Sequence, residues 1–371
     1  MKSPKDFLLK MPIDLRLRKL AQQTVRYSVG LRKGETCVIS GDTTAIPFLV
    51  ELYKEVILQG GHPIVRVNLP NVSDFFYKYA NDEQINKFPQ HFMDMAKSAQ
   101  CYIGVISGTN TRELSNCDPK KIAARGKVTH SISDYIVNNR DKIRRCTIAN
   151  PLSEALAQDS EMSNNEFENF VFKSCLIDWK KFGKRIEKIS KVFEKGSNVH
   201  LIGENVDLKF SIKSKNSKAD DGKENMPGGE FFMAPVRESM NGWIKFEYPA
   251  IRDGTEVTDV ELKFEKGKVV EAKSSKNEKF LNDMINIDEN ASYVGEFGVG
   301  CNPGINKFTK SLLFDEKING TIHLALGMAY KENGGGNDSA IHVDIAKDMH
   351  KGKIIVDGKV IQENGKWEMR V

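Results

Sequence analysis

The stretch TCVISGDTTAIPFLVELYKEVILQGGHPIVRV, residues 36–67, decides the fold class of the first half of the chain. Its apolar start, residues 36–40, predicts a short buried strand. Residues 46–59 then place apolar side chains at helical spacing, and the pair Gly60-Gly61 ends the helix, as glycine commonly does. A second apolar run, residues 64–67, follows at once. This order of strand, helix and strand favours a parallel sheet with helices on both of its faces.

The same alternation continues on both sides of this stretch. Upstream, residues 17–25 have helical spacing and are followed by Gly30, and residues 101–106 and 146–149 are apolar runs separated by polar, helix-like segments. The segment GDTTAIP lacks the G-x-G-x-x-G pattern, so no dinucleotide site is predicted there. We expect this half to be a scaffold or to cover the substrate, with the aromatic cluster Phe75-Phe76-Tyr77 in core or interdomain packing.

The second half has shorter strands that are often paired. A charged, helix-prone segment, residues 164–194, connects the two halves. Beyond it we predict one helix and two hairpins, at residues 278–285, 257–264 with 269–274, and 353–356 with 359–362. The predicted fold class is therefore α/β: a mostly parallel amino-terminal α/β domain, residues 1–180, and a carboxy-terminal α+β domain, residues 181–371. The candidate site lies in the second domain.

Composition is that of a globular protein. The chain has 371 residues, of which 40% are hydrophobic and 28% charged, and a net charge of +5. Acidic residues interrupt every basic run, which argues against a nucleic-acid partner. No signal-peptide pattern and no apolar run of about 18 residues occurs, so no membrane partner and a cytoplasmic location are expected. The cysteines form no C-x-x-C pair, so neither a zinc ribbon nor a disulfide framework is predicted.

The segment SAIHVDI places His342 and Asp344 two residues apart in a strand-like run. Side chains alternate faces along a strand, so these two point the same way. An imidazole and a carboxylate that converge on one point suit zinc, cobalt or manganese. Alone, the pair is also compatible with a surface hydrogen bond.

Other ligand-type residues accompany this pair. His323 lies in the strand-like run GTIHLALGMAY, which ends at Tyr330, and Glu316 lies just upstream in LFDEK. Glu230 and Glu296 each follow glycine in apolar surroundings, where an unpaired carboxylate would be costly to bury. A divalent cation would explain several buried carboxylates at once. The alternative is that each carboxylate ends a strand and is capped by nearby amide groups.

Four segments carry a resemblance to a known family: PGGEFFMAPVRESMNG, GEFGVGCNPGI, LFDEKINGTIHLALGMAY and GGNDSAIHVD. In order and spacing they resemble the thermophilic-type metallo-aminopeptidases, the aminopeptidase T and S family. The amino-terminal half resembles the same family in LAQQTVRYSVGLRKGE and LVELYKEVILQGGHPIVRV. Cys301 departs from the pattern, since an apolar residue is more usual there, and this thiol is a candidate redox or inhibitory liability.

The resemblance implies a two-metal site whose catalytic residues would be Glu296, Glu316 and Tyr330. Its metal ligands would be Glu230, Glu296, Glu316, His323, His342 and Asp344. Two divalent ions (zinc, cobalt or manganese) would polarise a peptide carbonyl and activate water, a glutamate would act as base, and tyrosine would stabilise the oxyanion. The implied partners are peptides with a free amino terminus and a second copy of the chain in a homodimer.

Two other functions stay open. His323, His342 and Asp344 alone form the two-histidine, one-carboxylate set of non-haem iron enzymes, and some ring-cleaving dioxygenases look related to this peptidase family. The three additional glutamates argue against that assignment, because a mononuclear iron site does not need them. A non-catalytic metal-binding or scaffold protein of the same fold would be favoured by loss of a ligand, and no ligand position is lost.

Overall fold

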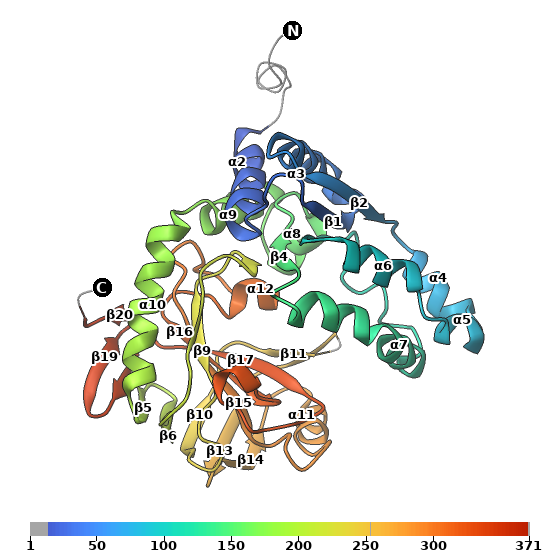
Figure 1. The fold of residues 1–371 in the computed structure, drawn as a ribbon. Coiled ribbons are helices and arrows are strands. Elements are labelled where there is room, and N and C mark those ends of the chain that lie inside the picture. The colour runs from blue at the N-terminus through green and yellow to red at the C-terminus, as the bar shows by residue number, and fades with distance from the viewer. Residues whose placement is uncertain (1–13, 253, 370–371) are drawn as a thin grey trace. The chain divides into compact units, whose positions relative to one another are not determined.

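The computed structural model describes residues 14–252 and 254–369. These residues form two compact units, each with its own sheets (Figure 1). The first unit contains the described residues up to Gln158 together with Met162–Leu176 and Lys223–Met226, and the second contains Asp159–Glu161, Ile177–Gly222 and the described residues from Pro227 onward. The two domains predicted from the sequence, residues 1–180 and 181–371, stay a prediction.

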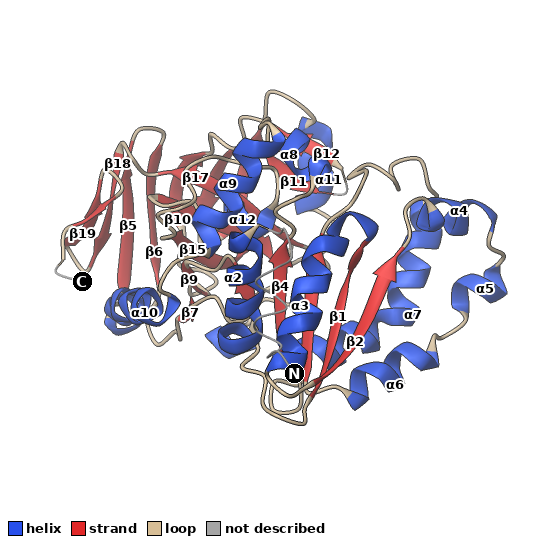
Figure 2. Ribbon diagram, turned by 90° about the horizontal axis from the view of Figure 1, so that it is seen from above, coloured by secondary structure: helices blue, strands red, loops and turns tan. Residues whose placement is uncertain are grey.

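An all-parallel sheet forms the centre of the first unit. Its strands follow the order β2-β1-β3-β4-β8. They are β1 (Thr36–Asp42), β2 (His62–Asn68), β3 (Cys101–Ile106), β4 (Arg144–Ala149) and β8 (Asn225–Met226). Two helices precede β1, α2 (Leu15–Gln23) and η1 (Thr24–Ser28). The helices between the strands are η2 (Thr43–Ala45), α3 (Ile46–Leu58), α4 (Val72–Tyr79), α5 (Asp82–Asn86), α6 (Gln90–Ser98), α7 (Pro119–Asn138), α8 (Glu154–Asp159) and α9 (Asn164–Cys175). Helices lie on both faces of this sheet, as the sequence predicted (Figure 2).

Helix α3 is apolar on more than its packed side. Its inner face packs on β1 and β2, and its outer face carries Ile46, Val50, Tyr53 and Ile57, which are 41–50% exposed. Their spacing of four, three and four residues aligns them along one stripe of the helix. A helix that is apolar all round is typical of a buried position, so this stripe is a candidate contact surface.

The aromatic cluster of α4 does not lie in a core. None of the residues of α4 is buried, and Phe75 is 66% exposed. The expectation that Phe75-Phe76-Tyr77 packs in a core is therefore wrong, and the alternative of interdomain packing stays a prediction. Phe76 contacts Tyr77 within the cluster and lies under the guanidinium of Arg125, so a local surface cluster accounts for these rings.

The second unit is mainly antiparallel. One sheet has the order β14-β13-β10-β6-β5-β18-β19-β20 and another the order β17-β16-β15-β9-β7, while β11 and β12 pair separately. The strands are β5 (Asn198–Gly203), β6 (Val206–Ser211), β7 (Lys218–Asp220), β9 (Glu230–Met233), β10 (Asn241–Lys245), β11 (Ala250–Arg252), β12 (Thr255–Val257), β13 (Glu261–Glu265), β14 (Lys268–Lys273), β15 (Val294–Gly300), β16 (Thr321–Gly327), β17 (His342–Asp348), β18 (Gly352–Val356), β19 (Lys359–Glu363) and β20 (Lys366–Trp367). The helices are α10 (Trp179–Lys195), α11 (Glu278–Ile285), α12 (Leu312–Asp315) and η3 (Lys331–Asn333).

One hydrophobic cluster joins α10 to the two large sheets. The ring centroids of Phe193 on α10 and Phe231 on β9 are 4.8 Å apart, and those of Phe210 on β6 and Phe297 on β15 are 5.0 Å apart. Phe231 and Phe297 thus point from one face of the five-stranded sheet into this core. The opposite face of that sheet is left for polar residues.

Most predicted elements of this unit are present, and the α/β fold class is confirmed, with one parallel sheet and several antiparallel ones. Helix α11 and the hairpin β18–β19 occur where the sequence predicted them. The predicted strand at 257–264 is wrong as one element, because β12 ends at Val257 and β13 begins at Glu261. Asp259 between them has a φ of 53°, a conformation that breaks a strand. Among the described residues, no helix is long and apolar enough to span a membrane.

Candidate metal centre

The predicted site residues lie on one face of the five-stranded sheet. Along β15, Phe297 and Val299 belong to the core, so Glu296, Gly298 and Gly300 point to the other face. The same alternation holds along the neighbouring strands. It directs to that face Glu230 of β9, His323 and Ala325 of β16, and His342, Asp344 and Ala346 of β17.

Strand register brings these side chains into adjacent rows. Glu296 is paired with Ala325, and Ala325 with Asp344, so the two carboxylates flank a small residue. In the next row His323 lies between Gly298 and Ala346. A Cβ atom at Gly298 would stand 2.0 Å from Nε2 of His323, so only glycine leaves room for this imidazole.

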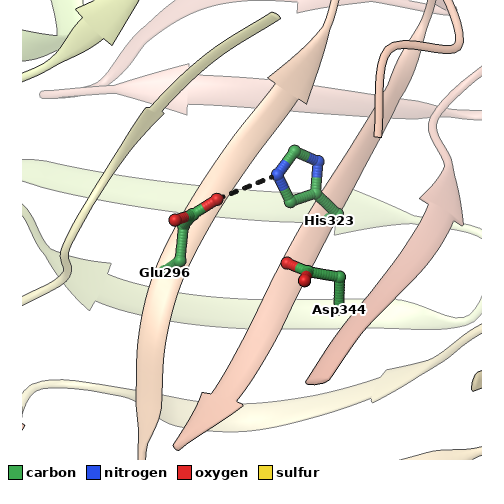
Figure 3. Close-up of side chains that lie close together, drawn as sticks. All are labelled: Glu296, His323 and Asp344. Carbon is green, nitrogen blue, oxygen red and sulfur yellow. Dashed lines mark hydrogen bonds and ion pairs between the residues drawn. The ribbon is translucent and has the colours of Figure 1, made fainter. Parts of the chain in front are cut away.

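Glu296, His323 and Asp344 form the centre of the cluster. One potential ligand atom from each lies within 4.8 Å of the others, and all three side chains are buried. Figure 3 shows them pointing toward one another from three neighbouring strands. Nε2 of His323 is 3.3 Å from Oε1 of Glu296. Such distances between donor atoms resemble the edges of a metal coordination shell, whose bonds are about 2 Å long.

His342 extends the cluster on one side. Its Nε2 is 3.4 Å from Oδ2 of Asp344 and 4.0 Å from Oε2 of Glu296. Its Nδ1 is 2.9 Å from the carbonyl oxygen of Met328, which can only accept a hydrogen bond. Nδ1 therefore carries the proton, and the lone pair on Nε2 points into the cluster, as a metal-ligating histidine requires.

Glu230 extends the cluster on the other side. Its Oε2 is 3.4 Å from Nε2 of His323, and its Oε1 is 2.8 Å from Nζ of Lys317. Glu230 is 3% exposed, so this carboxylate is almost entirely removed from water. The structure thus brings Glu230, Glu296, His323, His342 and Asp344 into one continuous set of contacts.

Glu316 reaches the cluster from a different element. It caps the carboxyl end of the short helix α12, and its Oε2 accepts a hydrogen bond of 3.0 Å from Lys317. Its side chain is 17% exposed, which makes it the most accessible of the predicted carboxylate ligands. The side chain of His342 is exposed to a similar extent, 19%. Glu316 is therefore joined to the other ligand candidates through Lys317.

Tyr330 lies at the edge of the cluster. It follows β16 and precedes η3, and its ring centroid is 5.3 Å from that of His342. The residue is 41% exposed, so part of its surface is open to solvent.

Burial sets the electrostatics of the cluster. It raises the pKa of Glu230, of Glu316 and of Asp344 above the ordinary carboxyl values. Burial opposes the charge of His323, but the hydrogen bond to Glu296 and nearby carboxylates outweigh it and raise the pKa to about 9. The pKa of His342 is also raised, with burial opposed by Asp344 and Glu296. The cluster therefore holds acid groups that need a counter-cation.

The residues fit divalent metal ions. Four atoms of the cluster are buried without a hydrogen-bond partner: Oε2 of Glu230, Nδ1 of His323, and Oδ1 and Oδ2 of Asp344. Buried polar atoms without partners are costly, and three of these four are carboxylate oxygens directed into the cluster. The donors are oxygen and imidazole nitrogen, which suit zinc, cobalt or manganese.

A pocket of about 150 Å³ opens onto this cluster. Glu316, His323, His342 and Asp344 line one side of it. Apolar side chains line much of the rest, among them Pro249, Ile251, Phe308, Leu312 and Val343, together with the charged residues Arg252, Lys310 and Asp315. The pocket therefore combines polar groups that can act chemically with apolar walls that can hold a side chain.

Cys301 and Lys317 are both buried. Cys301 belongs to the hydrophobic core, where its Sγ lies 3.4 Å from the carbonyl oxygen of Val299, and burial raises the pKa of the thiol. Lys317 is 1% exposed and contacts two of the predicted ligands, yet sequence reasoning assigned it no role. The sequence feature that could have indicated a role for Lys317 was its position between Glu316 and the apolar run around His323.

Comparisons with known proteins identify the family of this chain. The family model described as thermophilic metalloprotease (M29) matches residues 13–367. Aminopeptidase AmpS of Bacillus subtilis (strain 168) is 27% identical over 410 residues, which cover 95% of this chain and 98% of AmpS. The chain therefore belongs to the thermophilic metalloprotease (M29) family, as the resemblance in its sequence predicted. It is a metallo-aminopeptidase, a hydrolase of peptide bonds that depends on divalent metal.

Two solved structures share the fold. Wild-type AmpT from Thermus thermophilus superposes with a TM-score of 0.82 at 21% identity, covering 96% of this chain and 99% of AmpT. A 2,5-dihydroxypyridine dioxygenase from Pseudomonas putida KT2440 superposes with a TM-score of 0.63 at 11% identity, covering 97% and 99%. At these identities the likeness concerns the fold, so it does not separate a peptidase from a dioxygenase.

Proposed function

We propose that this enzyme removes the amino-terminal residue of peptides with the help of two divalent metal ions bridged by Glu296. The observation that supports this most strongly is the division of the Glu296 carboxylate. Its Oε1 faces His323 and its Oε2 faces His342, so the two oxygens serve different neighbours. A carboxylate in this arrangement suits a bridge between two ions.

The remaining ligands divide in the same way. Glu230, Glu296, Glu316, His323, His342 and Asp344 would together hold the two ions. The contacts place Glu230 and His323 on one side of Glu296, and His342 and Asp344 on the other. Zinc, cobalt and manganese are all compatible with these donors. When bound, the ions polarise the scissile carbonyl and lower the pKa of water toward neutrality.

The protein's own groups would handle the protons and the developing charge. Glu316 is the more accessible carboxylate, and its raised pKa suits a base that takes a proton from water and passes it to the leaving amine. Tyr330, exposed beside His342, would donate a hydrogen bond to the oxyanion. The roles of Glu296, Glu316 and Tyr330 as catalytic residues are part of this proposal.

The proposed substrate is a peptide with a free amino terminus. Its amino group would be held by the ions and by the carboxylates beside them, of which Glu316 and Asp344 line the pocket. The side chain of the first residue would lie against the apolar walls formed by Pro249, Ile251, Phe308 and Leu312. An acetylated terminus removes the positive charge and adds bulk, so it should not be accepted.

Ring cleavage by mononuclear iron is the alternative enzyme class. It would use His323, His342 and Asp344 and leave Glu230 and Glu296 without a role. Both glutamates are nonetheless buried and directed into the cluster, Glu230 at 3% and Glu296 at 5% exposure. Buried carboxylates without function would be costly, which favours the two-metal hydrolase.

A paired assay separates the two classes. The protein is stripped with a chelator and reloaded with zinc, cobalt, manganese or iron(II), and then supplied with leucyl peptides, their acetylated counterparts, or a dihydroxypyridine under oxygen. Restoration of cleavage by the first three metals, for free amino termini alone, is expected. Equal cleavage of acetylated peptides would refute the aminopeptidase assignment, and oxygen-dependent ring opening without peptidase activity would refute hydrolysis altogether.

We also propose a cytoplasmic homodimer. The exposed stripe of Ile46, Val50, Tyr53 and Ile57 on α3 supports it, because the same stripe from a second copy, running antiparallel, could cover it. Light scattering should give twice the chain mass for the wild type. Val50→Glu should yield monomers, and a Val50→Glu protein that still forms dimers would remove α3 from the interface.

A further inference from the structure

Lys317 is a buried cation inside the acidic cluster. Its side chain is 1% exposed, and its Nζ lies 2.8 Å from Oε1 of Glu230 and 3.0 Å from Oε2 of Glu316. A lysine this deeply buried is unfavourable unless its charge is paired and its donors are used. The two glutamates supply both requirements, so the ammonium and the carboxylates depend on one another.

The contact with Lys317 gives the two oxygens of Glu230 different roles. Oε1 accepts the hydrogen bond from Lys317, whereas Oε2 is buried without a hydrogen-bond partner and faces His323 at 3.4 Å. Rotation of the carboxylate would break the bond to Lys317. The ammonium therefore holds Glu230 in the orientation that presents Oε2 to the cluster.

The main chain of Lys317 is fixed to the loop that precedes Glu230. Its carbonyl accepts a hydrogen bond of 3.0 Å from the amide of Asn302, and Nδ2 of Asn302 donates to the carbonyl of Gly228 at 2.8 Å. The amide of Lys317 in turn donates to Phe314 in α12. Lysine and glutamate are thus anchored to the same short network, which limits the movement of one relative to the other.

We infer that Lys317 is a positioning residue for metal binding: it orients Glu230, and secondarily Glu316, toward the ion held with His323. This inference rests on the proposed two-metal function. Lys317 would act on the ion in two opposite ways. Its charge repels a cation, whereas its hydrogen bond orients a ligand for that cation. The sign of the change on removing Lys317 therefore distinguishes positioning from simple charge compensation.

The test compares zinc binding to the metal-free wild type and to Lys317→Met by calorimetry. The wild type should bind two equivalents. In Lys317→Met one equivalent should bind at least about tenfold more weakly, as loss of a ligand's supporting hydrogen bond usually causes. The other equivalent, held by His342 and Asp344, should be unchanged. The visible spectrum of the cobalt-loaded protein should lose the contribution of one ion in the same variant.

Lys347→Met is the matched control. Lys347 is also 1% exposed and lies on β17, but it pairs with Glu247, which is not among the ligand candidates. This variant also removes a buried ammonium from the second unit, so its two equivalents should bind as in the wild type. Lys317→Arg, which keeps the charge and can donate to Glu230, should recover part of the lost affinity.

Each outcome decides the inference. Lys317→Met that binds both equivalents as tightly as the wild type, or more tightly, overturns it. If the wild type binds a single equivalent, the two-metal function fails. The inference about Lys317 then holds if Lys317→Met binds that equivalent more weakly, and it is overturned if the affinity is unchanged. If Lys317→Met does not fold, Lys317→Gln retains one donor for Glu230 without the charge that repels the ion, so it should bind both equivalents about as tightly as the wild type, and loss of one equivalent in this variant would overturn the inference.

Discussion

Gly298 on β15 lies directly opposite His323 on β16, and a Cβ atom at Gly298 would stand 2.0 Å from Nε2 of that histidine. The imidazole can therefore occupy the space above the sheet only because residue 298 has no side chain. Since His323 also contacts Glu230 and Glu296, the position of one glycine determines the geometry of the cluster.

Gly298→Ala should displace the ring of His323 and weaken metal binding by about tenfold or more, comparable to the loss of a ligand's supporting contact. Metal content after dialysis against a buffered zinc solution measures this change. Gly104→Ala on β3 is the control, because the nearest atom to an added Cβ there is at 3.5 Å, an ordinary contact. Equal zinc content in the wild type and Gly298→Ala would contradict the proposed role of His323.

His342→Ala should remove one of the two metal equivalents. The Nε2 of His342 is directed into the cluster by the hydrogen bond from Nδ1 to Met328, so the variant loses a donor that is already oriented. Peptidase activity should fall at least about 100-fold, while circular dichroism stays unchanged because the core on the other face of the sheet does not include this residue. Retention of both equivalents would exclude His342 as a ligand.

Tyr330→Phe should lower kcat by about 10²–10³-fold without changing the metal content, if the hydroxyl stabilises the oxyanion. The aromatic contact with His342 survives in phenylalanine, so the variant removes the hydroxyl alone. Steady-state kinetics on a leucyl arylamide, combined with metal analysis of the same sample, checks both parts. An unchanged kcat would remove Tyr330 from the mechanism.

Metal uptake should depend on pH in a defined direction. The pKa of His323 in the metal-free protein is raised to about 9, and that of His342 is also raised, so both imidazoles hold a proton more firmly than a free histidine does. Binding must displace these protons, and the apparent affinity should rise with pH, by up to about tenfold per unit for each proton released, until the pH passes about 9. Zinc titrations between pH 6 and 9 measure the slope. An affinity for zinc that does not change between pH 6 and 9 would contradict the release of protons from the two histidines on metal binding.

Much of the site could be predicted from local sequence patterns. His342 and Asp344 lie two residues apart on a strand, which is enough to place them on one face, and the glycines before Glu230 and Glu296 marked carboxylates in apolar surroundings. The sequence also predicted the alternating strands and helices of the first unit, because the apolar run in each strand is short and clearly bounded.

Other features depend on long-range pairing that local patterns do not contain. The register between β15 and β16 shifts between Val294 and Glu296, and only this register places Gly298 opposite His323. Lys317 is a neighbour of Glu316 in sequence, but its contact with Glu230 crosses 87 positions (317 − 230). For the cluster Phe75-Phe76-Tyr77, apolarity favoured core or interdomain packing, although apolar side chains are also common on protein surfaces, where Phe75 is exposed.

Anomalous scattering from crystals grown with zinc or manganese tests the central claim most directly, because it locates the ions independently of activity. The account predicts two peaks separated by the carboxylate of Glu296, one bounded by Glu230 and His323 and the other by His342 and Asp344. A single peak at His323, His342 and Asp344, with Glu230 turned away from it, would contradict the two-metal aminopeptidase.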